Sequence, residues 1–232
     1  MAERIRLPAW LWLWFPPVLA VVVIGARLFA PDFYNAYIEP ENGLVELATP
    51  LVSLIGFVVG ISMLRHLYRI PSQPMRIWIL GLTLACFYLA GEELSWGQQL
   101  FQWETPETLA ELNDQNETNL HNMSSWFDQK PRLLLELWVL VGGILLPLKR
   151  LWLGGQPRSV FWRWFWPARE CIPTAVLAIG IKLPERYRDF AGPGSLPFEI
   201  RWSEPQEYYF ALFLLIYLLA VNARMHGKRV PL

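Results

Sequence analysis

Six apolar segments, separated by polar stretches, run along the whole 232-residue chain. Each is long enough, or nearly so, to cross the hydrocarbon core of a bilayer, which is about 30 Å thick. The pattern predicts an all-α fold: a polytopic membrane bundle of about six transmembrane helices that forms one domain over residues 1–232. The predicted spans lie near residues 9–30, 44–64, 77–100, 132–148, 167–183 and 206–223.

The composition indicates that lipid is the solvent. Hydrophobic residues make up 54% of the chain and charged residues only 17%, whereas soluble domains carry about 25% charged residues. Most of the 13 tryptophans stand near the ends of apolar segments, where interfacial aromatic belts form. No basic stripe stands free of a predicted membrane edge, so nucleic acid is not an expected partner. The expected partner is the lipid bilayer itself.

Charged residues are sorted along the chain by sign. If the N-terminus lies in the cytoplasm, the cytoplasmic segments hold most of the basic residues and a single acid, Glu3, while the acids gather on the other side. The positive-inside rule therefore predicts that both termini face the cytoplasm. The chain shows no evident soluble domain beside its apolar segments, and this simple organisation favours a bacterial inner (plasma) membrane.

Glu92 and Glu93 are the most unusual polar residues within the apolar segments. Glu92 lies roughly 24 Å along the third predicted helix from Arg76 at the cytoplasmic edge, about a turn below the outer boundary. The helix dipole disfavours negative charge there, so an arginine, a cation, a proton or a set of donors must stabilise the pair. Three further carboxylates are expected at the same level, in the first turns of their own helices: Glu46, Glu136 and Glu207.

The loop over residues 101–131 follows these glutamates and is rich in amide side chains. Apolar residues are interleaved with the amides, which favours a cap folded over the mouth of the bundle rather than a disordered loop. Amides offer both donors and acceptors, and can therefore bind a polar head group or satisfy buried backbone. The candidate substrate ligands in this region are Gln99, Asn116 and Asn119.

His121 is the one histidine expected on the outer side. Together with Glu92 and Glu93 it could form a carboxylate–imidazole acid–base pair, so these three residues are the catalytic candidates. With Glu117 they are also candidate ligands of a divalent metal. The spacing is not diagnostic of a metal, and a structural role for His121 remains an alternative.

Charges alternate in sign between Pro184 and Pro205, in the last outer loop. One interpretation is a solvated loop whose charges pair with one another. In the other, Arg186 and Arg201 fold over the acidic mouth, where they pair with a glutamate or bind an anionic head group.

The string GEELSWGQ, followed by ETP and NETNLHN, resembles a motif pattern of bacterial multi-pass membrane proteins that have no established activity. The resemblance covers about 32 residues. The paired glutamates are also similar to those of intramembrane CAAX-type proteases. However, Gly97 stands where that motif has an arginine, and the later segments lack its two further histidines.

Three functions fit this pattern. The first is a membrane-embedded enzyme that acts on a lipid or lipid-linked envelope substrate from the outer face. The second is an ion-coupled transporter, for which six spans suffice only as a homo-oligomer or a half-unit. The third is an accessory or assembly subunit that docks a membrane-protein partner. We favour the first, because costly carboxylates are expected beside a histidine in a lipid-accessible bundle.

Overall fold

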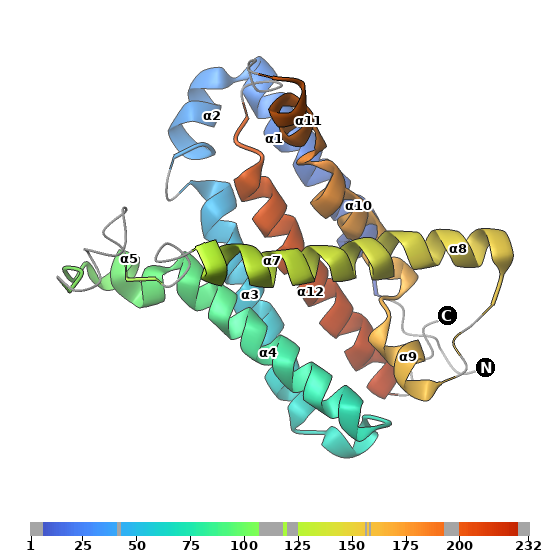
Figure 1. The fold of residues 1–232 in the computed structure, drawn as a ribbon. Coiled ribbons are helices and arrows are strands. Elements are labelled where there is room, and N and C mark those ends of the chain that lie inside the picture. The colour runs from blue at the N-terminus through green and yellow to red at the C-terminus, as the bar shows by residue number, and fades with distance from the viewer. Residues whose placement is uncertain are drawn as a thin grey trace.

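The computed structural model describes residues 7–40, 43–106, 118–119, 125–155, 157, 159–192 and 200–226. All regular secondary structure within these ranges is helical, which confirms the predicted all-α class (Figure 1). Within the described ranges, five helical segments are long and apolar enough to cross a membrane. They are Trp10–Phe29, Leu44–Leu64, Gln73–Glu93, Gln129–Leu153 and Ser203–Met225.

The N-terminal half contains three of these segments and two short helices. Its α3 coincides with the apolar segment expected over residues 44–64. The elements in chain order are a π-helical turn Trp10–Trp14, α1 Phe15–Phe29, α2 Pro31–Tyr37, α3 Leu44–Leu64, a 3₁₀ turn Leu67–Arg69, α4 Gln73–Glu93, a 3₁₀ turn Ser95–Gly97 and α5 Gln98–Phe101.

In the C-terminal half, one long helix crosses the last helix obliquely (Figure 1). It consists of α7 and α8, which are joined by a π-helical turn. The elements are α7 Ser125–Leu140, the turn Val141–Leu145, α8 Leu146–Leu153, α9 Val160–Phe165, a 3₁₀ turn Arg169–Cys171, α10 Ile172–Gly180, α11 Leu183–Ala191 and α12 Ser203–Met225.

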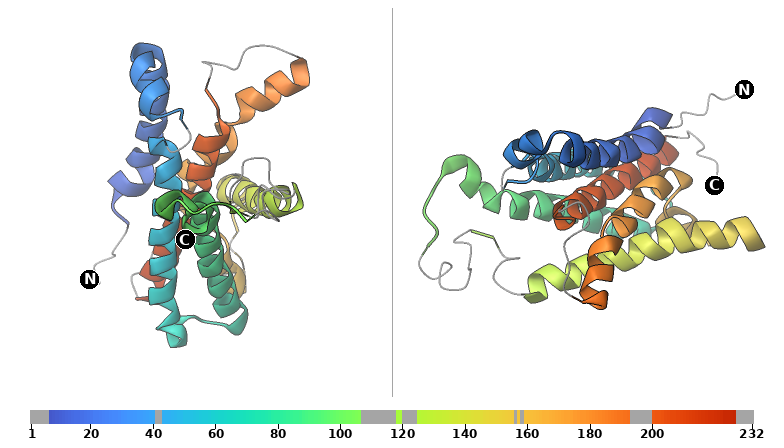
Figure 2. Two further views of the ribbon diagram at one scale, coloured as in Figure 1. Left: turned by 90° about the vertical axis from the view of Figure 1, so that its left-hand side faces the viewer. Right: turned by 90° about the horizontal axis from the view of Figure 1, so that it is seen from above.

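The last helix, α12, lies inside the bundle (Figure 2). It packs against α3, α10 and α4, and 78% of its apolar window is buried. The corresponding share is at most 39% in the other four candidate spans. These helices therefore leave most of their apolar surface on the outside, as expected where lipid rather than water surrounds the protein.

A sixth span over residues 167–183 is not confirmed. In this segment α10 has nine residues, or roughly 13 Å of helix, which is too short for a hydrocarbon core of about 30 Å. Both α10 and α11 begin with a proline in their first two positions, Pro173 and Pro184. A proline inside one continuous helix would remove a backbone hydrogen bond, so the segment divides into separate short helices.

The two ends of the bundle differ in charge. At one end the rings of His66 and His226 lie 6.1 Å apart, and Arg224 donates to the Arg163 carbonyl over 3.1 Å. Leu7 packs against the buried pair of Ala168 and Ala220, and Ala220 belongs to α12, so the described N-terminal end lies near the C-terminal end of this helix. At the opposite end four carboxylates lie close enough to interact electrostatically: Glu46, Glu93, Glu204 and Glu207.

Small residues allow α3 and α4 to approach each other closely. A Cβ atom built on Gly60 would lie 2.2 Å from the Thr83 hydroxyl oxygen. This hydroxyl donates to the Ile79 carbonyl over 2.7 Å, so it cannot move away without losing a buried hydrogen bond. Glycine at position 60 therefore sets the spacing of the two helices.

We expect Gly60→Ala to lower the free energy of unfolding by about 1–3 kcal/mol, because the added methyl group overpacks the contact with Thr83. Thermal unfolding of the purified protein in detergent measures the effect. Gly81→Ala is the matched control on α4, where a Cβ meets no described heavy atom within 4 Å. The control should keep or slightly raise the stability. Equal stability of the Gly60→Ala variant and the wild type would contradict the close approach.

Candidate functional site

The helical path of the chain breaks into a tight turn immediately after Glu93, where α4 ends. Ser95, Trp96 and Gly97 have φ angles of 46°, 55° and 103°, in the left-handed region that only glycine adopts without cost. The Trp96 indole Nε1 donates to Glu92 Oε1 over 2.6 Å. These contacts correct the expected span over residues 77–100 to a helix over Gln73–Glu93 that is followed by a tight turn.

Gly91 makes this turn possible. A Cβ atom at this position would lie 2.8 Å from Trp96 Cε3, so any larger residue would push the indole off the last turn of α4. The Trp96 ring thereby covers Glu92, which is only 3% exposed. A buried carboxylate needs hydrogen-bond donors, and the indole N–H supplies one at the helix end where the dipole gives no help.

The start of the amide-rich loop folds back onto this turn through Gln98. Its Nε2 donates to the Trp103 carbonyl over 3.1 Å and to Thr105 Oγ1 over 2.8 Å. Its Oε1 accepts a bond of 2.5 Å from the Thr118 amide, and Trp103 Nε1 donates to Thr118 Oγ1 over 3.2 Å. The Gln98 side chain thus fastens two distant parts of the loop together.

Asn119 is one of the predicted substrate ligands, and the structure places it beside the turn. It is 3% exposed, and its Nδ2 donates to Ser95 Oγ over 3.3 Å. Its described contact is therefore with the protein itself. The other candidates of this loop, Asn116, Glu117 and His121, lie outside the described residues, as does the side chain of Gln99. Their roles remain predictions.

Arg132, near the start of α7, supplies positive charge at the acidic end of the bundle. Its Nη1 donates to Glu207 Oε1 over 2.7 Å and its Nη2 to Gln206 Oε1 over 2.6 Å. Gln206 is fully buried, and its Nε2 donates to the Ala178 carbonyl over 2.9 Å. One arginine and one glutamine therefore connect α7, α12 and α10.

The sequence pattern did not predict Arg132 as a residue of the site, although the chain carries a signal for it. The residue follows Pro131 at the start of an apolar segment, on the side of the membrane where acids predominate. A buried pair of glutamates requires a compensating cation at this level, and Arg132 supplies one. Arg132 and the carboxylates of Glu46, Glu204 and Glu207 all lie within electrostatic range of Glu93.

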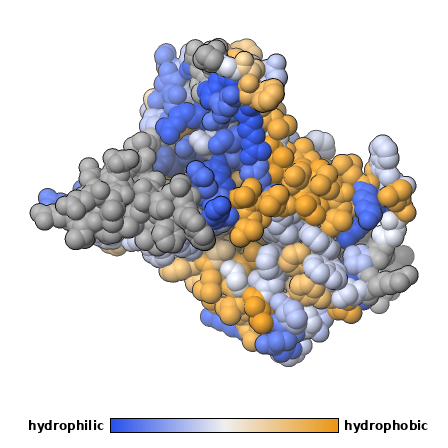
Figure 3. Space-filling model, in the orientation of Figure 1, coloured by the Kyte–Doolittle hydropathy of each residue, from blue (hydrophilic) through white to orange (hydrophobic). Residues whose placement is uncertain are grey.

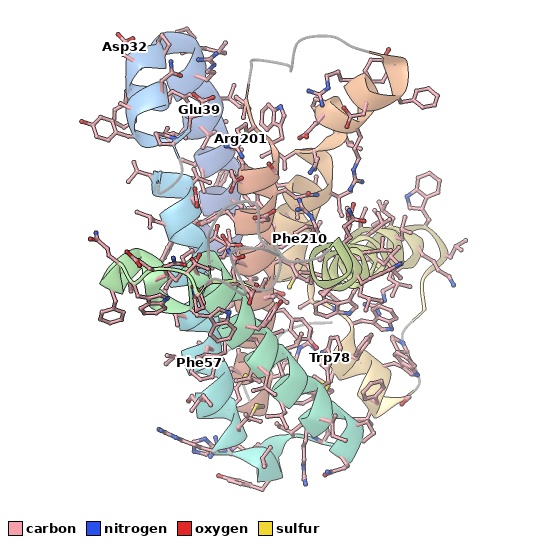
Figure 4. All side chains as sticks on the ribbon, turned by 60° about the vertical axis from the view of Figure 1, so that its left-hand side comes forward. Asp32, Glu39, Phe57, Trp78, Arg201 and Phe210 are labelled. Atoms are coloured by element: carbon pink, nitrogen blue, oxygen red, sulfur yellow. The ribbon has the colours of Figure 1, made fainter. Side chains whose placement is uncertain are left out.

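The structure places the arginines of the last outer loop in other pairs. Arg186 forms an ion pair with Glu136, and Arg201 Nη2 lies 3.8 Å from Glu204 Oε1. Figure 4 shows Arg201 beside the α2 end of the bundle. There the pKa of Tyr34 is raised, by burial first and by Glu39 second, against the opposing charges of Arg27 and Arg201. Binding of a substrate by Arg186 or Arg201 remains a prediction.

A cavity of about 310 Å³ lies between α3, α4, α7 and α12. Four charged residues line it: Glu92, Glu93, Arg132 and Glu207. The other lining residues are mainly apolar, and they include Trp78 and Phe210, which Figure 4 shows in the interior of the bundle. The cavity is therefore amphipathic, with charge at one end and hydrocarbon and aromatic walls along the rest.

The cavity reaches the outer surface of the bundle. Leu134 on α7 lines it and is 70% exposed. Figure 3 shows hydrophilic atoms gathered above α7 and hydrophobic atoms covering much of α7 and α8. A molecule that enters past Leu134 would thus come from the apolar surroundings of the helices.

Among the described residues, no group of three or more His, Cys, Asp and Glu side chains could hold a metal ion. Glu92 and Glu93 are the described members of the candidate metal set. Because Glu117 and His121 lie outside the described part of the chain, the metal site remains a prediction, as does the acid–base pair with His121.

Comparison with known proteins gives no relative: no protein-family model, no curated protein and no solved structure matches the chain.

We expect Arg132→Ala to lower the free energy of unfolding by about 1–3 kcal/mol, because Glu207 and Gln206 lose a charged hydrogen-bond donor. Thermal unfolding of this variant, of Glu207→Gln and of the double variant gives the coupling of the pair. Arg188→Ala serves as the control, since Arg188 pairs only with its exposed neighbour Asp189 among the described contacts, and should change stability by about 0.5 kcal/mol or less. Additive effects of Arg132→Ala and Glu207→Gln would contradict a direct interaction.

Proposed function

We propose that this protein is a membrane-embedded enzyme that binds a lipid or lipid-linked envelope substrate in the amphipathic cavity and acts on its polar head group. The observation that carries the proposal is the cavity itself, in which three carboxylates and one guanidinium stand at the end of apolar walls. Ligand sites are typically apolar pockets with a few convergent polar groups. A lipid matches such a pocket, because it joins an apolar chain to a polar head group.

The charged end provides groups for binding and for proton transfer. Arg132 uses two of its five N–H groups on Glu207 and Gln206, so further donors are available for a phosphate or carbonyl oxygen. Glu93 lines the cavity beside these groups. In our proposal Glu93 accepts a proton from a hydroxyl or water at the head group, and His121 serves as its acid–base partner.

Glu92 has a different role in this scheme. Its carboxylate accepts a hydrogen bond from Trp96 at 2.6 Å, which fixes its orientation at the end of α4. An oriented carboxylate can position a head-group amine or hydroxyl, or hold a metal together with Glu93, Glu117 and His121.

We further propose that the charged end faces the periplasm of a bacterial inner membrane. The basic end, with Arg163 and Arg224, would then lie in the cytoplasm, in agreement with the positive-inside rule. Leu7 lies beside Ala220, so the described ends of the chain share one end of the bundle, and an even number of passages is required. In this topology residues 167–183, which contain the 3₁₀ turn Arg169–Cys171 and α10, make the sixth passage.

We expect Glu93→Gln to fold and insert like the wild type but to lose at least about tenfold in affinity for the lipid that co-purifies with it, because a charged hydrogen-bond partner is removed. Mass spectrometry of lipids extracted after purification in mild detergent measures this. Elemental analysis of the same samples measures bound metal, with Glu92→Gln and His121→Ala in parallel. Glu104→Gln, at an exposed position outside the cavity, is the control.

The outcomes separate the three functions. Loss of lipid in Glu93→Gln but not in Glu104→Gln supports the enzyme. Lipid content that is unchanged in all variants, together with loss of a defined membrane-protein partner, would support the accessory subunit instead. Unchanged lipid content with proton- or cation-coupled uptake abolished in Glu93→Gln would support the transporter.

A further inference from the structure

We infer that the cavity takes one hydrocarbon chain of its lipid, and that Trp78 and Trp138 form a floor that limits the length of this chain. The inference deepens the proposed function, because it concerns the same cavity and depends on a lipid as its occupant.

One face of α4 lines the cavity from end to end. Trp78, Leu82, Ala85, Leu89 and Glu92 line it at spacings of three and four residues, which places them on one side of the helix. From Trp78 to Glu92 this face runs roughly 21 Å, somewhat more than the roughly 15 Å depth of one leaflet's hydrocarbon. A chain with its polar end at Glu92 would therefore reach Trp78 only if its extended length is about that of this face.

The size of the cavity fits one chain. Its volume of about 310 Å³ is at the lower end of the range of roughly 300–1,000 Å³ for ligand pockets. A lipid with two chains would have to leave the second chain outside. The side opening at Leu134, which is 70% exposed, provides the place for it, since this leucine belongs to both the cavity wall and the outer surface.

An aromatic cluster closes the far end of the cavity. The rings of Trp78 and Trp138 lie 5.1 Å apart, and Trp138 packs edge-on against Tyr217 at 4.9 Å and against Phe213 at 5.4 Å. Trp78 Nε1 donates to the Tyr217 hydroxyl over 3.0 Å, and this hydroxyl donates in turn to the carbonyls of α9. The floor is thus held by packing and hydrogen bonds from several helices, and a chain cannot push it aside without breaking them.

Binding of a homologous series of lysophosphatidylethanolamines tests the inference. These lipids have one chain of chosen length, an ammonium group that suits the carboxylates and a phosphate that suits Arg132. For the wild type, affinity should rise with chain length up to a limit and then stop rising. Each methylene that fits should strengthen binding by about fourfold, the equivalent of about 0.8 kcal/mol.

Two variants should move the limit in opposite directions. Leu82→Trp fills the cavity one turn above the floor, so the limit should fall and long chains should bind at least about tenfold more weakly. Trp138→Ala opens the floor, so the limit should move to longer chains. The matched controls have the same substitutions on the outer surface: Leu84→Trp, where the leucine is 55% exposed, and Trp152→Ala, where the tryptophan is 83% exposed. Neither control should move the limit.

A limit that stays in place in both cavity variants would overturn the inference, and so would controls that move it equally. If only one of the two cavity variants folds, the chain-length limit of that variant decides whether the inference stands. Failure of the proposed function gives a different result: no lipid of any length binds the wild type, or Glu93→Gln binds the whole series as the wild type does. If Glu93→Gln loses binding but the chain-length limit is the same in both cavity variants, the lipid site stands and the role of the two tryptophans as a floor is rejected.

Discussion

The burial of α12 is the constraint on which the rest of the structure depends. Its apolar window is 78% buried, so other helices must surround it and α10 must pack against it although α10 is short. Because α12 is buried, polar residues at its N-terminal end are buried as well. Gln206 is fully buried there, and a buried amide must be satisfied on both its oxygen and its nitrogen. Arg132 and the Ala178 carbonyl satisfy it, and Arg132 thereby comes to stand beside Glu207.

A second constraint is the buried carboxylate of Glu92 at the end of α4, which must be stabilised. Glu92 lies where the helix dipole disfavours a carboxylate, and a helix that continued to residue 100 would give it no donor from its own turn. The left-handed backbone after Glu93 brings the Trp96 indole back to Glu92, with Gly91 making room for the ring. The same turn places Gln98 where it can connect the beginning and the end of the described loop.

These two arrangements produce the cavity. α4 brings two glutamates, α12 brings Glu207 and α7 brings Arg132, all at one end, while the remaining walls are mainly apolar. Charges close to apolar walls are stabilised by one another more than by water, because the local dielectric is low. They can therefore bind a polar group that arrives attached to a hydrocarbon chain, which is the basis of the function proposed for this protein.

The sequence by itself determined the helical class, five of the six predicted membrane-length segments and the separation of charge between the two ends, since these depend on composition and local periodicity. It also singled out Glu92 and Glu93, because carboxylates in an apolar segment are costly wherever the helix packs. The tertiary structure alone decided that α4 ends at Glu93, that residues 167–183 divide into short helices, and that Arg132 is the arginine near the glutamates. Each of these depends on contacts between segments far apart in the chain, which local periodicity does not specify.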